Sequence, residues 1–394
     1  SDLARVEVQV RRIVADVRKH GDPALRRYAE KLDGLSSRQP FRVGEDELDH
    51  AWSSVSEEFH QALQTAAANI RRYCEWQKPK EWSQSTQPGI QVGQVVRPLQ
   101  SAGCYVPGGR YPLPSTMLMT VIPAQVAGVT NIRVVSPRPA RETLAAAFFL
   151  GIKEFYRIGG AQAIAALAYG TKSIPRVDKI VGPGNLFVTA AKKQVAFDCS
   201  IDFLAGPTEV VIMAHRGEPR FIAADLVAQA EHDLDALAVF ITTSYELAQA
   251  VAKKIASSSS KNKTAKASLA RNGAILVAVS REQATEFANR IAPEHITVEE
   301  EDLPRIQNAG SIFVGDYSPQ AAGDYAVGPN HVLPTGAMAR IRGGLGINDF
   351  VKIISVQQLS RDGLNQIAPA VVTLAEAEGL KAHADSIRAR YAHA

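Results

Sequence analysis

An adjacent carboxylate and imidazole, Glu294 and His295, follow Pro293 at the end of a helix-like segment. Imidazole titrates near neutral pH and can take a proton from an alcohol, while a carboxylate can activate a water molecule. On the dipeptide alone, a surface Glu beside a half-buried His is the more common arrangement. The pair is therefore a candidate for acid–base chemistry only in combination with other parts of the chain.

Possible metal ligands occur in three separate segments. Gln229 and His232 are three residues apart in a helical segment and are expected to share a helix face, although for this pair by itself a solvated face is the favoured interpretation. Asp324 precedes a Gly/Pro-rich loop that ends at His331, and His383 lies in the last helical segment. Gln229, His232, Asp324 and His383 would together supply two nitrogen and two oxygen ligands, which suits zinc. Sequence spacing does not show whether they converge.

Three glycine-rich turns could approach a nucleotide, but none is a complete motif. The segment 182–187 follows a predicted strand and has Phe187 where the dinucleotide fingerprint G-x-G-x-x-G requires a third glycine. The segments 105–110 and 159–162 place an aromatic ring and an amide beside glycine pairs. Each turn is more often a plain connection between a strand and a helix. No Walker-type phosphate loop is present in the sequence.

Short β-branched runs alternate with alanine-rich helical segments from about residue 95 onward. Strands that are apolar throughout and alternate with helices indicate parallel sheets covered on both faces. The sequence therefore predicts an α/β fold. The predicted strands are 131–135, 178–181, 209–213, 237–243, 274–279 and 311–315, and two of the predicted helices are 161–169 and 221–230.

The first quarter of the chain is predicted to be helical. Gly21, Asp22 and Pro23 end one helix and begin the next. Apolar residues between Trp52 and Tyr73 recur at steps of three and four, which predicts one long amphipathic helix that ends at Lys78-Pro79. The polar segment 257–263 is expected to be a surface connection, and a boundary is expected near residue 345, before a helical pattern around 370–384.

Composition excludes several classes of protein. The 394 residues carry a formal net charge of +4, too small an excess for a nucleic-acid or membrane-surface role. With 46% hydrophobic and 21% charged residues the chain is globular rather than disordered. Three cysteines without a C-x-x-C pair favour a reducing cytoplasm. No apolar run is long enough to span a membrane, and Ser1 in place of Met suggests a trimmed N-terminus.

Taken in order, eight segments of the chain resemble the histidinol dehydrogenase family, which carries out the last two steps of histidine biosynthesis. They span most of the sequence from residue 100 to residue 383, and their length and order are specific. The segments are 105–116, 159–171, 180–195, 205–212, 224–233, 292–296, 323–336 and 375–383.

The resemblance implies a fold of two related, incomplete Rossmann-like domains, one inserted in the other, and a homodimer that exchanges its C-terminal tails. On this basis residues 1–104 and 209–345 form the first domain with the N-terminal helices, 105–208 form the inserted domain, and 346–394 form the tail. An atypical cofactor site agrees with the missing third glycine of the dinucleotide fingerprint.

The resemblance also implies roles for individual residues. His295 matches the base that removes the alcohol proton, and Glu294 matches the base that activates water in the second oxidation. Gln229, His232, Asp324 and His383 match the ligands of one zinc ion per subunit. The residues that match contacts to NAD are Tyr105, Gln162 and Asn185. The residues that match contacts to L-histidinol are Thr208, Gln229, His232, His295, Asp324, Glu378 and His383.

One departure from the family concerns the substrate pocket, because Thr208 stands where many members have Ser and its methyl group narrows the pocket. Three alternatives stay open from the sequence. A related zinc and NAD dehydrogenase could oxidise another polar primary alcohol, although Glu378 favours a substrate with a cationic amine. A zinc hydrolase could use Glu294 without a cofactor, and a non-catalytic binding protein could share the scaffold.

Overall fold

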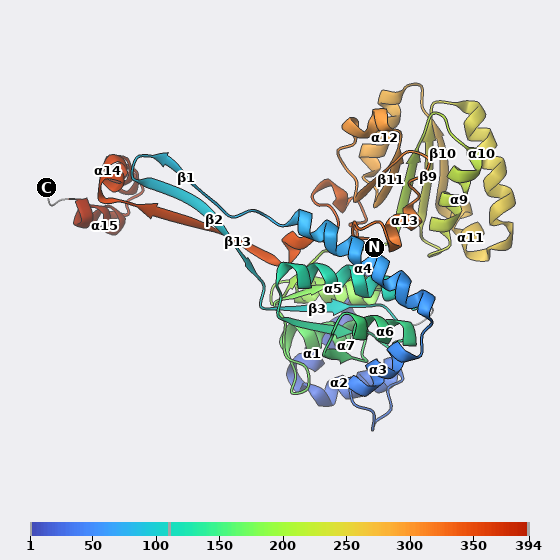
Figure 1. Ribbon diagram of the computed structural model, residues 1–394, viewed down its shortest axis with the longest axis horizontal. Coiled ribbons are helices and arrows are strands. Elements are labelled where there is room, and N and C mark those ends of the chain that lie inside the picture. Colours follow the sequence, from blue (N-terminus) through green and yellow to red (C-terminus); the bar gives the residue numbers. More distant parts are fainter. Residues whose placement is uncertain (1, 109–111, 392–394) are drawn as a thin grey trace. The chain divides into compact units, whose positions relative to one another are not determined.

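The computed structural model describes residues 2–108 and 112–391. The chain divides into two compact units, one made of residues 1–77 and 99–350 and the other of residues 78–98 and 351–394. Figure 1 labels the elements of both units. Ser1, Gly109 and Arg110, which were considered in the sequence, lie outside the described residues.

The first unit contains a five-stranded parallel sheet with the order β5-β4-β3-β6-β7. All five residues of its central strand are buried, as expected when helices cover both faces. The sequence identified β4 and β6 but missed β3, whose Ala and Gly residues carry no β-branched signal, and the very short β5 and β7. The strands are β3 (Ser101–Tyr105), β4 (Asn131–Val135), β5 (Glu154–Tyr156), β6 (Lys179–Val181) and β7 (Ser200–Ile201).

Helices cover both faces of this sheet. On one face α1, α2, α7 and α8 share a continuous hydrophobic core with the strands. On the other face α5 lies against β3 and β4, α4 and α6 pack against α5, and α3 packs against α6. The helices are α1 (Asp2–His20), α2 (Asp22–Tyr28), the π-helical turn η1 (Ala29–Asp33), α3 (Glu45–Ser53), α4 (Glu57–Gln77), α5 (Pro114–Ala127), α6 (Arg141–Phe149), α7 (Gly160–Tyr169) and α8 (Leu186–Val195).

Two expectations for the N-terminal helices were wrong. They were grouped with the strands of 209–345, but α1 and α2 bury their apolar faces against the sheet of β3–β7. The single helix expected between Trp52 and Tyr73 is divided into α3 and α4. The division lies at Ser54 and Ser56, whose hydroxyls bond the backbone of Ala51 and Phe59 and so compete with helix continuation. The breaks at Gly21–Pro23 and Lys78-Pro79 are confirmed.

A second parallel sheet in the first unit has the order β10-β9-β8-β11-β12, so it repeats the strand order of the first sheet. Val210 and Ile212 point into one hydrophobic cluster, while Val211 and Met213 point into another. Both faces of the sheet are therefore buried. The strands are β8 (Glu209–Met213), β9 (Leu237–Thr242), β10 (Gly273–Val277), β11 (His295–Val298) and β12 (Ser311–Val314).

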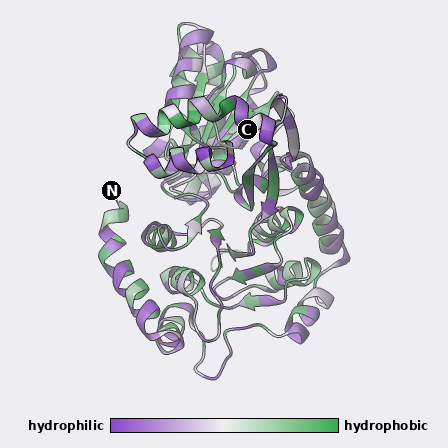
Figure 2. Ribbon diagram, turned by 90° about the vertical axis from the view of Figure 1, so that its left-hand side faces the viewer, coloured by the Kyte–Doolittle hydropathy of each residue, from purple (hydrophilic) through white to green (hydrophobic). Residues whose placement is uncertain are grey.

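The helices α9, α10 and α11 lie on one side of the second sheet and α12 lies on the other (Figure 1). Figure 2 shows hydrophobic strands between helices whose outer faces are hydrophilic. The segment 257–263, expected to be a surface connection, is largely helical. It contains the end of α10, the short helix η2 and the first residue of α11. The elements are α9 (Pro219–Ala230), α10 (Tyr245–Ser258), η2 (Ser259–Lys261), α11 (Lys263–Asn272), α12 (Arg281–Ile291), η3 (Glu300–Arg305), α13 (Gln320–Tyr325), η4 (Met338–Arg340) and η5 (Ile347–Asp349).

The predicted α/β class with parallel sheets is confirmed by these two sheets. Their shared strand order, with later strands added on either side of the first, is that of a doubly wound fold. The insertion of residues 105–208 as a separate domain stays a prediction.

The second unit is a three-stranded antiparallel sheet followed by two helices that pack on each other. The expected tail of 346–394 supplies only one of these strands, because the other two come from residues 82–98. The helical pattern expected around 370–384 is divided at Gly379, which has a φ of 77°. The elements are β1 (Trp82–Gln87), β2 (Ile90–Pro98), β13 (Val351–Leu359), α14 (Arg361–Ala377) and α15 (Lys381–Tyr391).

No helix among residues 2–108 and 112–391 is both long and apolar enough to span a membrane.

Candidate active site

A cavity of about 590 Å³ in the first unit collects most of the candidate residues. The sheet of β3–β7 contributes residues that follow its strands, among them Pro107, Gly184 and Asn185. The sheet of β8–β12 contributes Thr208, which precedes β8, and Glu294, which precedes β11. The pocket therefore lies at the carboxyl edge of one parallel sheet and at the amino edge of the other.

The side chain of Glu294 is held in place through one of its two carboxylate oxygens. Its Oε2 accepts hydrogen bonds from the Thr208 hydroxyl at 2.5 Å and from the Glu209 backbone N–H at 2.9 Å. These contacts follow from the sheet, because β8 and β11 are neighbouring parallel strands whose first residues lie side by side. Glu294 is 8% exposed, so the carboxylate is buried but borders the pocket.

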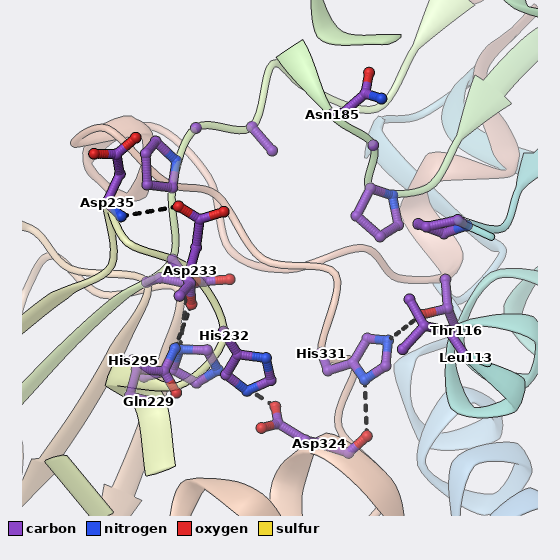
Figure 3. A pocket seen from close by; sticks show the side chains of 18 of the residues that line it. Leu113, Thr116, Asn185, Gln229, His232, Asp233, Asp235, His295, Asp324 and His331 are labelled. Carbon is purple, nitrogen blue, oxygen red and sulfur yellow. Dashed lines mark hydrogen bonds and ion pairs between the residues drawn. The ribbon is translucent and has the colours of Figure 1, made fainter. Parts of the chain in front are cut away.

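His295 begins β11 and has two nitrogens with different partners. Its Nδ1 lies 3.2 Å from the Glu209 carbonyl oxygen, which can only accept, so a neutral imidazole carries its proton on Nδ1. Its Nε2 lies 3.5 Å from Asp324 Oδ1 (Figure 3). Burial alone would lower the pKa of His295, but hydrogen bonds and charges from Asp324 and Glu294 raise it to about 10.

Asp324 projects from α13 into the pocket among three imidazoles (Figure 3). Burial opposes its ionisation, yet the pKa of Asp324 is lowered by the hydrogen bond and charge of His295 and by the charges of His331 and His232. The site thus concentrates negative charge at one carboxylate and surrounds it with groups that can become cationic.

Gln229 lies in the last turn of α9 and His232 lies two residues beyond its end, so the helix face that their spacing predicted is not formed. Both residues nevertheless line the pocket. Gln229 is 4% exposed, and its Nε2 donates a hydrogen bond to the Thr208 hydroxyl. His232 follows the helix and is exposed at the pocket, where Figure 3 shows its ring near Asp324. His232, Asp324 and Gln229 thus present an imidazole, a carboxylate and an amide to the same cavity.

These three residues fit part of a zinc site. Among the described residues, however, no three His, Cys, Asp or Glu side chains are grouped closely enough to hold a metal ion. The fourth expected ligand, His383, and the expected substrate contact Glu378 belong to the second unit, where both are exposed on or beside α14 and α15. They are not among the residues that line the pocket of the first unit.

Only one of the three expected NAD contacts lines the pocket. Asn185 does so, and its side-chain oxygen also accepts hydrogen bonds from the N–H groups of Phe187 and Val188 at the start of α8. Tyr105 and Gln162 are instead 3% and 0% exposed. Tyr105 ends the central strand, and Gln162 lies in a helix whose residues are nearly all buried, so neither reaches the pocket surface.

Tyr105 and Gln162 stabilise the turn at Gly159 and Gly160 through hydrogen bonds, Tyr105 directly and Gln162 through Asp33. The Gly160 N–H donates to the Tyr105 hydroxyl at 3.1 Å, and burial raises the pKa of Tyr105 to about 12. Asp33 Oδ2 accepts from the Gly159 N–H and from Gln162 Nε2, both at 3.0 Å. Sequence reasoning missed Asp33, because nothing in the N-terminal helices links it to a turn more than a hundred residues away.

Two residues at or beside the site were also missed: His331 lines the pocket, and the backbone of Glu209 contacts Glu294 and His295. The His331 Nδ1 lies 2.7 Å from the Asp324 carbonyl oxygen, and its Nε2 lies 3.2 Å from the Thr116 hydroxyl. Burial lowers the pKa of His331. Its place in a Gly/Pro-rich loop shortly after Asp324 was a signal in the sequence, whereas Glu209 was hidden within an apolar strand.

Comparisons with known proteins identify relatives over the full length of the chain. A family model described as histidinol dehydrogenase matches residues 1–391. The histidinol dehydrogenase of Methanosarcina mazei is 48% identical, with 100% of this chain and 94% of the relative covered. That of Geobacter sulfurreducens is 45% identical, with 98% and 93% covered. The crystal structure of histidinol dehydrogenase from Elizabethkingia anophelis superposes with a TM-score of 0.94 at 37% identity, covering 98% of this chain and 92% of that one.

Proposed function

The chain belongs to the histidinol dehydrogenase family, and on that premise we propose that the pocket of its first unit oxidises L-histidinol to L-histidine through L-histidinal. Each oxidation transfers one hydride to NAD⁺, so two NAD⁺ are used for each L-histidinol. The observation that carries the proposal is the placement of Glu294 and His295 in one pocket, each with one reactive atom available. Glu294 Oε1 has no hydrogen-bond partner among the described residues, and His295 Nε2 lies 3.5 Å from Asp324 Oδ1.

In the first oxidation His295 is the proton acceptor. Because Nδ1 faces the Glu209 carbonyl, Nε2 is the atom that takes the hydroxyl proton while the carbinol C–H bond gives up its hydride and the C=O bond forms. His295 must be neutral for this step. Asp324, an expected zinc ligand, is one of the two carboxylates that raise the pKa of His295. A cation bound to Asp324 would offset its negative charge and so lower the pKa of His295.

The second oxidation begins with the addition of water, for which Glu294 is the proton acceptor. A water oxygen bonds to the aldehyde carbon while one water proton passes to Glu294. His295, protonated in the first oxidation, gives its proton to the former carbonyl oxygen, and the hydrated aldehyde results. The remaining C–H hydride of this hydrate passes to the second NAD⁺ while one O–H proton passes to His295, and the product is the carboxylic acid. A reactive aldehyde held between the two steps is protected from loss in a closed pocket.

We further propose that Gln229, His232 and Asp324 of the first unit hold zinc together with His383. Zinc, when bound, orients the substrate and polarises it. The donor set supports this assignment, since two nitrogens and two oxygens suit zinc. Manganese and cobalt are tolerated by the same ligand types.

NAD⁺ supplies the hydride acceptor, and the carboxyl edge of β3–β7 is where we place it. Asn185 at that edge contacts the cofactor in this proposal. Tyr105 and Gln162 act through the Gly159–Gly160 turn that they support, rather than by direct contact. This differs from the contacts that the family resemblance implied for them.

The remaining proposals concern the substrate and the assembly. Glu378 supplies a negative charge for the amine of L-histidinol, and Glu378 and His383 reach the site of a partner chain in a homodimer that exchanges its C-terminal tails. Three buried cysteines without a disulfide support a cytoplasmic location.

A direct test is to incubate the zinc-loaded protein with NAD⁺ and L-histidinol and to follow NADH absorbance. We expect NADH to form with L-histidinol and not with simple primary alcohols of similar size. No NADH from a protein with confirmed bound zinc would overturn the proposed function.

A further inference from the structure

Thr208 lies between the expected water-activating base and an expected metal ligand. Its hydroxyl contacts Glu294 Oε2 on one side and Gln229 Nε2 on the other. The three residues come from three places in the fold: the residue before β8, the residue before β11, and α9. Thr208 was expected to contact the substrate, but these two hydrogen bonds give its hydroxyl a different task.

The direction of this hydrogen-bond chain is determined by chemistry. A carboxylate oxygen can only accept, so the one hydrogen of the Thr208 hydroxyl is donated to Glu294. The hydroxyl oxygen is then left to accept, and its partner on Gln229 must be a donor. The amide of Gln229 therefore presents its nitrogen to Thr208 and turns its oxygen to the other side.

The outcome for Gln229 is a free amide oxygen. Among the described residues no hydrogen bond involves Gln229 Oε1, while the side chain as a whole is only 4% exposed. An amide coordinates a divalent cation through its oxygen and not through its NH₂ group. A reversed amide would present the wrong atom to the metal, and little water reaches this side chain to stabilise either orientation.

The two carboxylate oxygens of Glu294 consequently have different roles. Oε2 already accepts from the Thr208 hydroxyl and from the Glu209 N–H. Oε1 has no hydrogen-bond partner among the described residues, so it is the oxygen that can take a proton from water. With the proton on Oε1, Oε2 keeps both of its donors and the chain keeps its direction.

We propose that Thr208 is a positioning residue: its hydroxyl sets the direction of a hydrogen-bond chain that offers the Gln229 oxygen to zinc and leaves Glu294 Oε1 as the proton acceptor. The inference about Glu294 rests on the proposed function, whereas the inference about Gln229 concerns metal binding and can be tested without catalysis.

The first test measures zinc affinity by competition with a chelator in full-length Thr208→Val and Thr208→Ser. Valine keeps the shape and removes the hydroxyl, and serine keeps the hydroxyl. We expect the zinc dissociation constant to rise about tenfold or more in Thr208→Val and to stay within about threefold of wild type in Thr208→Ser, as for other residues that orient metal ligands. Equal zinc affinity in Thr208→Val and wild type would overturn the inference.

A matched control is Thr335→Val. The Thr335 hydroxyl accepts a hydrogen bond from the Gly206 N–H, so it supports the same loop without contacting Gln229 or Glu294. We expect its zinc affinity to stay within about threefold of wild type. A loss equal to that of Thr208→Val would assign the effect to the loop and contradict a role for the chain direction.

A double-mutant cycle keeps the inference testable if Thr208→Val is poorly stable. In a Gln229→Ala background the amide is gone, so adding Thr208→Val should lower zinc affinity no further. A full additional loss would contradict the inference. At saturating zinc, Thr208→Val should slow NADH formation from L-histidinal more than from L-histidinol. If wild type oxidises neither compound, the proposed function fails while the zinc measurements still decide the role of Thr208.

Discussion

Glu294 and His295 are consecutive in the chain but stand in different surroundings. Glu294 is fixed through Oε2 by a hydroxyl and a backbone N–H, whereas His295 is fixed through Nδ1 by a backbone carbonyl. Each residue therefore keeps one atom for proton transfer. The pairing of β8 with β11 determines which atom this is, because it places the Glu209 backbone beside the other atom of each residue. This arrangement lets two neighbouring residues serve two successive oxidations.

His295→Asn tests the role of the imidazole. We expect NADH formation from L-histidinol to fall by at least about a hundredfold, because positioned proton acceptors contribute roughly 10² to 10⁴ in rate. His215→Asn is the control, since His215 follows β8 at the opposite edge of the same sheet, and it should retain activity within about threefold. Activity of His295→Asn within tenfold of wild type, measured by NADH absorbance, would contradict the assignment.

At the scale of residues, the sequence predicted site residues best where they are close together in the chain. The Glu294-His295 dipeptide and the spacing of Gln229 and His232 both lead to pocket-lining side chains. The sequence did not show that Tyr105 and Gln162 are buried, because their burial depends on helices that pack over them from the N-terminus. Contacts of these two residues with NAD stay a prediction. Asp33 shows the same limit, since its contacts to the Gly159 turn are created only by tertiary packing.

At the scale of elements, the helix α9 contains a half-buried carboxyl group, that of Asp225. Burial raises the pKa of Asp225 to about 6 from a usual 3.8, and no other group offsets that cost among the described residues. The unfolded chain loses this proton near pH 4, but the folded protein keeps it until about pH 6. The contribution of Asp225 to the free energy of unfolding therefore falls as pH rises between those values and stays low above them.

Asp225→Asn should remove this penalty. We expect the free energy of unfolding to rise by about 1 to 3 kcal/mol at pH 8 and to change little near pH 3.5. Denaturant titrations of both proteins across that range measure the difference. A variant that is no more stable than wild type at pH 8 would show that a partner compensates the buried charge.

Asn185 has both a structural and a proposed binding role at the start of α8. Asn185→Ala should lower the free energy of unfolding by about 1 kcal/mol, because two helix N–H groups lose their acceptor. Asn185→Asp keeps the acceptor and should keep the stability. Its negative charge should nevertheless raise the KM for the anionic NAD⁺ by about tenfold. An unchanged KM in Asn185→Asp would place the cofactor away from this edge.

The elements that the sequence predicted are those with strong local patterns. Apolar β-branched runs identified β4, β6, β8, β9, β10 and β12. Strands that are short or rich in small residues, such as β3 and β5, were missed because their pairing partners rather than their composition make them strands. The polar segment 257–263 was misjudged because the end of α10 and the start of α11 share it.

At the scale of the whole molecule, the formal net charge of +4 conceals strong local charge. Asp324, Glu294 and three imidazoles share one cavity, and this concentration rather than the overall balance determines which ligands the pocket favours. Glu378 and His383, which we propose to complete the pocket of a partner chain, belong to the other unit.

Tail exchange can be tested by mixing two inactive variants, His295→Asn and His383→Asn. If each site combines the pocket of one chain with the tail of its partner, a mixed dimer regains one intact site of two. Random mixing should then restore about a quarter of wild-type activity, because half of the dimers are mixed. If each chain completes its own pocket, every site in the mixture carries one defect. No recovered activity in a preparation with confirmed mixed dimers would contradict exchange.

In the proposed function one pocket performs two successive oxidations, and Glu294 is needed only for the second, in which it accepts a proton from the added water. The most direct measurement is the number of NADH formed for each L-histidinol consumed, in wild type and in Glu294→Gln. We expect about two NADH from wild type, and about one from Glu294→Gln with L-histidinal as the product, because water is no longer activated. One NADH from wild type, or two from Glu294→Gln at the wild-type rate, would contradict the account.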